Sequence, residues 1–159
     1  MKKDTGTDRI EDPVRRSAMG DKYPKLIIGV DLDGTAWDHE WPAIGAVRPN
    51  AAKVLQRLYD GGHTLIIWTA RATPEHIQEA KDKLAEMGVR YHGFNDFPHS
   101  LRSLYGSYEG RKLSFSVLID DISLLGIPHD WEDIYMALVQ HWGIYDSRDL
   151  NWDKIEVNV

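Results

Sequence analysis

The feature that most constrains the fold is a series of short apolar runs, each of which ends at polar residues. Residues 26–30 (LIIGV) and 65–68 (LIIW) are continuously apolar, and residues 89–94 and 115–119 form two further short runs. Unbroken apolar runs of this length are typical of strands that are buried on both faces, as in a parallel sheet. Residues 35–47 and 95–110 contain turn formers and bulky side chains, and we expect them to be loops.

Amphipathic segments with helix signals alternate with these strands. Asn50 is positioned to cap a helix whose apolar face spans 51–58 and which ends at Gly61. Thr73 caps a second helix with Pro74 at its first position, and Asp130 caps a third over 131–140. The alternation predicts an α/β protein, a three-layer α/β/α sandwich around a central parallel sheet in a Rossmann-like arrangement.

Length and composition narrow the class of protein. The chain has 159 residues, from which we expect a polar, flexible arm over 1–22 and one domain over 23–159. The absence of cysteine excludes disulfides, thiolate catalysis and Cys-ligated zinc. No apolar run approaches the ~20 residues of a membrane span, and the N-terminus lacks the apolar segment of a secretory signal, so we expect a cytoplasmic protein without membrane partners.

Charged and hydroxyl side chains follow three of the expected strands. They are Asp31 and Asp33, then Thr69, then Asp120 and Asp121. Lys112 precedes the last strand. Ligands of open parallel sheets bind beyond the carboxyl ends of the strands, so we expect these groups to meet at one edge.

Several carboxylates at one sheet edge need a partner charge. Crowded, partly buried carboxylates would raise one another's pKa, and a hard divalent cation with oxygen ligands resolves the conflict. Mg²⁺ suits such a site because it binds one or two carboxylates, water and substrate phosphate. One carboxylate is then free to act as a nucleophile, and a turn at Gly34 can bring a second one back as a general acid and base.

Four segments in this order resemble the motifs of the haloacid dehalogenase superfamily of phosphohydrolases. They are DLDGT at 31–35, IIWTAR at 66–71, Lys112, and LIDD at 118–121. The runs WPAIG, GHTLIIWTAR and IPHDWEDIY also resemble a group of small bacterial and phage hydrolases or phosphatases. An Asp at position 33 fits the phosphatases of the superfamily and not its dehalogenases.

The resemblance implies a role for each motif residue. Asp31 would be the nucleophile and Asp33 the general acid and base, while Thr69 and Lys112 would bind the phosphate. Mg²⁺ would be held by Asp31, by the backbone carbonyl of Asp33, and by Asp121 or Asp120. We favour Asp121 as the direct ligand, with Asp120 binding through water or pairing with Lys112.

The same resemblance bears on access to the site. Only about a dozen residues separate Thr35 from the helix at Pro49, so we expect no large cap domain and an open site. Gly34 and Arg71 are further candidates for phosphate contact, although Arg71 could instead form a surface ion pair. Trp37 and Trp41 could stack on a base or sugar, or form a lid over the core.

The sequence therefore predicts a Mg²⁺-dependent phosphomonoester hydrolase that works through an aspartyl-phosphate. The expected substrate is a phosphorylated small molecule or an exposed phosphate ester. A nucleotidase or polynucleotide-end phosphatase is an alternative, although the net charge of −6 gives no basic track for long nucleic acid. A phosphate-binding or regulatory module without catalysis is the contrasting class.

Overall fold

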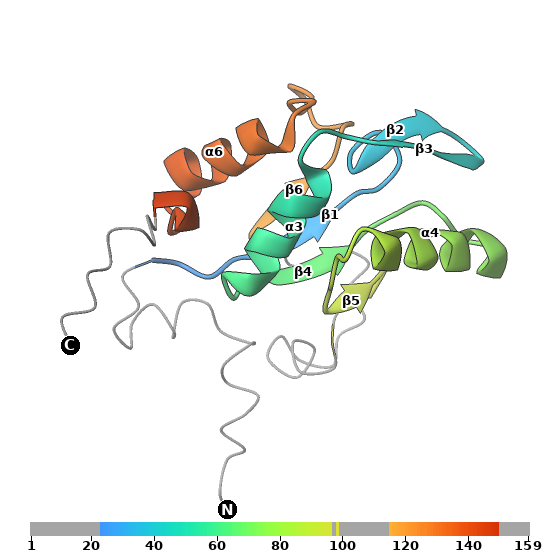
Figure 1. Cartoon of the computed structure of the whole chain (residues 1–159), viewed down its shortest axis with the longest axis horizontal. Coiled ribbons are helices and arrows are strands. Elements are labelled where there is room, and N and C mark those ends of the chain that lie inside the picture. Colours follow the sequence, from blue (N-terminus) through green and yellow to red (C-terminus); the bar gives the residue numbers. More distant parts are fainter. Residues whose placement is uncertain (1–22, 97, 99–114, 150–159) are drawn as a thin grey trace, which may run out of the picture.

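A computed structural model describes residues 23–96, 98 and 115–149. A four-stranded sheet forms its centre, made of β1 (Ile27–Val30), β4 (Thr64–Ile67), β5 (Gly93–Phe94) and β6 (Val117–Ile119). The strands are parallel in the order β5-β4-β1-β6, so β4 and β1 are the two central strands (Figure 1). This confirms the predicted α/β class and its parallel sheet.

The two central strands are buried because both of their faces are covered. β1 and β4 pair so that Val30 lies opposite Ile67, and every residue of both strands is buried. Ile28 and Val30 face the main core, whereas Ile27 packs with Ile66 and Phe115 on the other face. Burial on both faces explains why these strands lack polar alternation.

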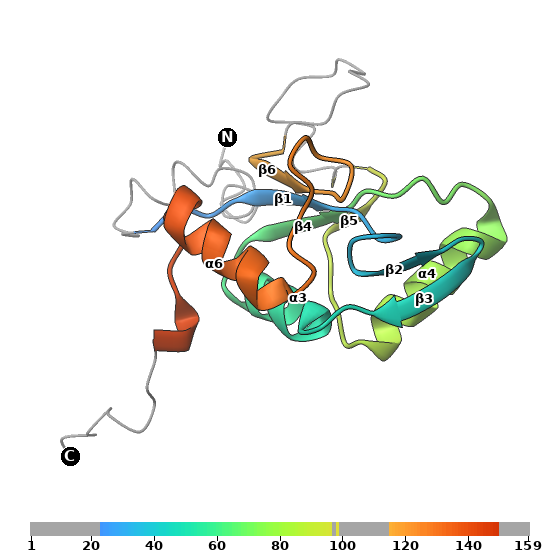
Figure 2. The same cartoon turned by 90° about the horizontal axis from the view of Figure 1, so that it is seen from above.

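Three helices lie on one face of the sheet: α3 (Ala51–Asp60), α4 (Pro74–Glu86) and α6 (Trp131–Trp142) (Figure 2). Their apolar faces join the main core, and α3 contacts α6. Most of the chain that links β5 to β6 is outside the described residues, so the second helical layer stays a prediction. The arm over 1–22, most of the 95–110 loop and Lys112 also lie outside them.

Two of the three predicted helix caps are confirmed. The Thr73 side chain accepts a hydrogen bond from the His76 amide, and Asp130 accepts one from the Glu132 amide. Asn50 precedes α3 but does not cap it through its side chain. Its φ of 62° is left-handed, and its side-chain amide donates to Asp130, so the predicted cap position is right but the expected side-chain hydrogen bond is wrong.

The predicted loop over 35–47 is also wrong, because most of it forms a β-hairpin. β2 (Trp37–Glu40) and β3 (Ala43–Val47) pair antiparallel. The hairpin lies beside α4, apart from the central sheet (Figures 1 and 2). Its turn at Trp41 and Pro42 carries none of the Asn-Gly or Asp-Gly signals of short hairpins, which explains the error.

The third strand and the C-terminal segment complete the description. β5 has only two of the six residues predicted for it. Just before it, the ring nitrogen Nδ1 of His92 accepts a hydrogen bond from the Leu65 amide at 3.0 Å. A short 3-10 helix, Ser147–Asp149, follows α6. Within the described ranges no helix is long and apolar enough to cross a membrane.

Candidate active site

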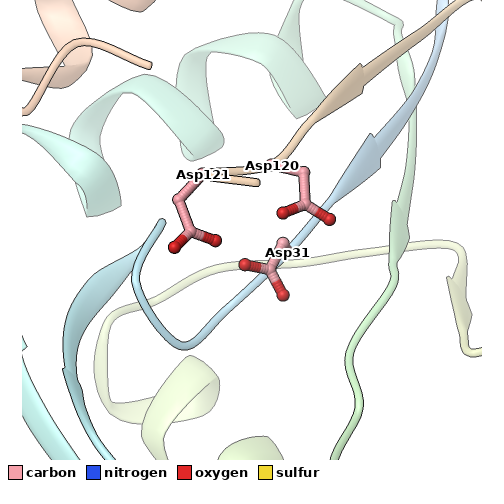
Figure 3. A group of neighbouring side chains, drawn as sticks. All are labelled: Asp31, Asp120 and Asp121. Carbon is pink, nitrogen blue, oxygen red and sulfur yellow. The ribbon is translucent and has the colours of Figure 1, made fainter. Parts of the chain in front are cut away.

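Three carboxylates meet at the carboxyl ends of β1 and β6. Asp31 follows β1, and Asp120 and Asp121 follow β6, which pairs with β1 in parallel. The Asp31 amide donates a hydrogen bond to the Ile119 carbonyl of β6 at 3.0 Å. One oxygen from each carboxylate lies within 4.8 Å of the others, and the three side chains point toward one another (Figure 3). The predicted convergence of these strand ends is therefore confirmed.

Burial and mutual proximity make it harder to ionise two of these carboxyl groups. Burial raises the pKa of Asp31 to about 7, and the nearby carboxyl groups of Asp120 and Asp121 add to the shift. Burial and Asp121 likewise raise the pKa of Asp120. Among the described residues no Lys or Arg forms an ion pair with any of the three. These three carboxylates could therefore hold a cation.

Thr35 and Gly34 hold the carboxylates of the two strands together. The buried Thr35 hydroxyl donates to Asp31 at 2.8 Å and accepts from the Asp121 amide at 3.1 Å. The indole Nε1 of Trp131 in α6 donates to the Thr35 carbonyl at 2.9 Å and so anchors this turn. Gly34 has a φ of +86°, and a Cβ there would lie 2.4 Å from Asp121, so only glycine permits this approach.

Asp33 is in a different environment from Asp31. Its carboxylate accepts hydrogen bonds from Nε and Nη2 of Arg71 at 2.8 and 2.7 Å, and from the Trp37 indole at 2.8 Å. Partial burial disfavours the charge of Asp33, but these donors outweigh it and hold its pKa below the usual value. Its carboxylate is not part of the three-carboxylate cluster, and metal binding by its carbonyl stays a prediction.

Arg71 joins Asp33 to the hairpin. The Arg71 side chain has no exposed surface, and its remaining donors reach the carbonyls of Pro42 at 3.3 Å and Ala43 at 3.2 Å. The surface ion pair considered from the sequence forms in part, because Nη1 of Arg71 lies 3.8 Å from Oε2 of the exposed Glu79, but the shorter pair with Asp33 is buried. A contact between Arg71 and substrate phosphate stays a prediction.

Thr69 lies at the end of β4, beside the carboxylates. Its backbone amide donates to the Asn95 side chain at 2.8 Å, and its hydroxyl accepts from the Arg71 amide at 3.2 Å. Asn95 thus holds the loop that presents Thr69. Phosphate binding by Thr69, Gly34 and Lys112 stays a prediction.

A cleft of about 500 Å³ surrounds these groups. Asp31, Asp33, Thr69, Arg71, Asp120 and Asp121 line it, together with His39, Trp41, Trp68 and Ile122. Sequence reasoning missed Trp68 and Ile122, although each directly adjoins a motif residue. Trp41 is 47% exposed and lines the cleft, so it is no lid over the core, whereas Trp37 is fully buried and cannot stack on a ligand.

Comparison with known proteins gives one informative relative. No family model matches the chain, and no curated protein matches it. A solved structure of a conserved protein coded by a locus of Bacteroides thetaiotaomicron is 33% identical, with a TM-score of 0.63. The match covers 74% of this chain and 91% of that one. At this identity and coverage, the chain belongs to the same family as the conserved Bacteroides thetaiotaomicron protein.

Proposed function

We propose that the protein is a Mg²⁺-dependent phosphomonoester hydrolase of the haloacid dehalogenase type, with Asp31 as the nucleophile. The observation that carries this proposal is the convergence of Asp31, Asp120 and Asp121 without a compensating cation in the described part of the chain. Partly buried carboxylates that face one another destabilise the fold, so their convergence favours a site that a bound cation stabilises.

The donor set fits Mg²⁺. All three side chains offer carboxylate oxygens, the ligands that a hard divalent cation prefers, and the cleft leaves room for water and phosphate. When bound, the ion would neutralise the carboxylates and the charge on the phosphoryl group. It would also favour the ionised, nucleophilic form of Asp31.

The reaction has two halves that use different carboxylates. First, an Asp31 oxygen attacks phosphorus, the ester P–O bond breaks, and Asp33 protonates the departing oxygen. Asp33 then takes a proton from a water that attacks the same phosphorus, which breaks the bond to Asp31 and releases inorganic phosphate. Arg71 and Trp37 favour the ionised Asp33 required for the second half, and protonation for the first half requires these hydrogen bonds to loosen. Thr69 and Lys112 would hold the phosphoryl oxygens.

Hydrolysis of p-nitrophenyl phosphate by the full chain tests the proposal. We expect turnover with Mg²⁺, loss with chelator, and recovery when Mg²⁺ is restored. Asp31→Asn should reduce activity to background, and Asp33→Asn should reduce it about 10²–10⁴-fold, the usual contribution of a general acid or base. Asp82→Asn, at an exposed carboxylate of α4, is the matched control and should leave activity unchanged.

The outcomes separate the classes of function. Wild-type activity in Asp31→Asn would refute the nucleophile. Saturable phosphate-ester binding without turnover across a broad panel of monoesters would instead support a binding module.

A further inference from the structure

The walls of the cleft are apolar and aromatic, in contrast to its acidic floor. Trp41 comes from the hairpin turn, Trp68 from the end of β4, and Ile122 from the turn after Asp121. Three separate segments thus place apolar side chains beside the same carboxylates. Ile122 is 85% exposed, so its side chain is accessible to a ligand in the cleft.

Contacts behind the two indole rings hold them in place. The Trp41 ring contacts the Arg71 guanidinium at 5.0 Å and the His76 ring at 4.8 Å. The half-buried Trp68 ring packs edge-on against Phe115 at 6.0 Å. Rings positioned in this way lose little conformational entropy on binding, so they suit the recognition of a planar group.

The charges of the cleft disfavour a second anionic group on the ligand. Among the described residues that line it, Arg71 is the one permanent cation, and its guanidinium is already bound to Asp33 and to two hairpin carbonyls. With Mg²⁺ at Asp31, Asp120 and Asp121 and with Arg71 bound to Asp33, the described lining residues leave no free cation for a second phosphate or carboxylate. A leaving group that is neutral therefore fits best.

The size of the cleft favours a small molecule. Its volume of about 500 Å³ falls in the range of small-molecule sites, roughly 300–1,000 Å³. A phosphate at the carboxylates leaves space for one ring system near the indoles. A polynucleotide would extend past the cleft, where a chain of net charge −6 offers little attraction.

We propose that the substrate is a small phosphomonoester whose leaving group carries an aromatic ring and no second phosphate. This inference rests on the proposed phosphatase function and adds the substrate class. The ring stacks on Trp41 or Trp68 while its phosphate lies at Asp31. Nucleoside monophosphates and aryl phosphates share this chemistry.

The test compares kcat/KM across substrates, with the full chain and Mg²⁺. The aromatic arm contains a nucleoside 5′-monophosphate, a nucleoside 3′-monophosphate and phenyl phosphate, and the other arm contains glycerol 1-phosphate and glucose 6-phosphate. We expect at least one aromatic ester to exceed both aliphatic esters by roughly tenfold or more, as stacking on an aromatic side chain allows. A nucleoside 3′,5′-bisphosphate should be a poorer substrate than the corresponding monophosphate.

Variants at the two indoles identify the stacking partner. Trp41→Ala or Trp68→Ala should lower kcat/KM for the preferred aromatic ester by roughly five- to hundredfold, and change it for glycerol 1-phosphate less than about threefold. Trp41→Phe should restore much of the loss if Trp41 stacks. Trp142→Ala is the matched control, because Trp142 in α6 is 44% exposed but does not line the cleft.

The failures of the two proposals are distinguishable. Equal kcat/KM for aromatic and aliphatic esters, or equal losses for both classes in the Trp variants, would overturn the substrate inference while hydrolysis still stands. Hydrolysis of no monoester in either arm would overturn both proposals. The relative rates of the nucleoside and phenyl esters show which ring is preferred.

Discussion

Two groups of carboxylates in this molecule have opposite surroundings. At the site, Asp31, Asp120 and Asp121 face one another, and the pKa values of Asp31 and Asp120 are raised. Beside α6, Glu132 accepts hydrogen bonds from Arg57 at 3.1 and 3.2 Å and from Arg148 at 3.0 Å. The Arg148 guanidinium also binds Asp146. We call these two groups the site cluster and the α6 cluster, the latter comprising Glu132, Asp146, Arg57 and Arg148.

The difference separates a stabilising cluster from a ligand-binding one. Hydrogen bonds from arginine hold the pKa values of Glu132 and Asp146 below their usual range, so the α6 cluster is complete and joins α3, α6 and the segment after α6. In the described part of the chain the site cluster has no such arginine donors, and under the proposed function a bound cation would complete it. Asp33 lies beside the site cluster, but its carboxylate is paired with an arginine, Arg71, as the carboxylates of the α6 cluster are.

The largest effect on stability is expected when Asp33 loses its ion pair with Arg71. Arg71→Met leaves a partly buried carboxylate facing the site cluster, and breaking a buried pair in this way costs about 3–5 kcal/mol. Urea unfolding should show this loss, and the double variant Asp33→Asn, Arg71→Met should recover part of it. Arg90→Met breaks an exposed pair with Asp60 and should cost less than about 1 kcal/mol. If Arg71→Met and Arg90→Met lower the unfolding free energy by similar amounts, burial of the Arg71–Asp33 pair contributes little to stability.

Completing the site cluster with metal should have the next largest effect. Mg²⁺ at about 100 times its dissociation constant should stabilise the wild-type protein by about 2.7 kcal/mol, because the ion binds the folded state. Thermal unfolding with and without Mg²⁺ measures this shift, which Asp121→Asn should reduce sharply. Glu132→Gln, in the α6 cluster, should keep the full response. A wild-type-sized response in Asp121→Asn would remove Asp121 from the metal site.

Neutralising one carboxylate in each cluster should change stability in opposite directions. Glu132→Gln weakens hydrogen bonds to two arginines and should destabilise the protein by about 1–2 kcal/mol. Asp120→Asn removes a repulsive charge and should stabilise the metal-free protein by less than about 1 kcal/mol. Denaturant midpoints in chelator measure both changes. Destabilisation of the metal-free protein by Asp120→Asn would contradict the repulsion inferred for the site cluster.

The two clusters should also differ in the pH dependence of stability. The pKa of Asp31 is about 7 in the folded protein and near 3.8 when unfolded, so the folded state binds more protons between these values. Its contribution therefore lowers the metal-free unfolding free energy as pH rises from about 4 to 7. Glu132 has the opposite sign, because its pKa is lowered on folding and its contribution is lost as pH falls below about 4.5.

Unfolding free energies measured across pH in chelator separate these slopes. Asp31→Asn should reduce the decline toward pH 7, to which Asp120 also contributes because its pKa is raised as well. Glu132→Gln should weaken the loss at acid pH. An unchanged decline toward pH 7 in Asp31→Asn would assign that proton to another group.

Much of the site could be predicted because its signals are local in the sequence. Apolar runs marked the central strands, and polar residues directly after them marked the strand ends, where parallel pairing brings Asp31 to Asp120 and Asp121. Thr73 and Asp130 marked helix starts through hydrogen bonds that reach only two or three residues along the chain.

The sequence by itself thus determined the parallel sheet and which carboxylates meet at its edge, because strand burial and chain direction follow from local patterns. Only the tertiary structure decided that Asp33 pairs with Arg71, 38 residues away, and that the 35–47 segment forms a hairpin bound to that arginine. It also decided that the Asn50 side chain donates to Asp130 and not to its own helix. These contacts depend on where separate segments lie in space, and no local periodicity or turn signal encodes that position.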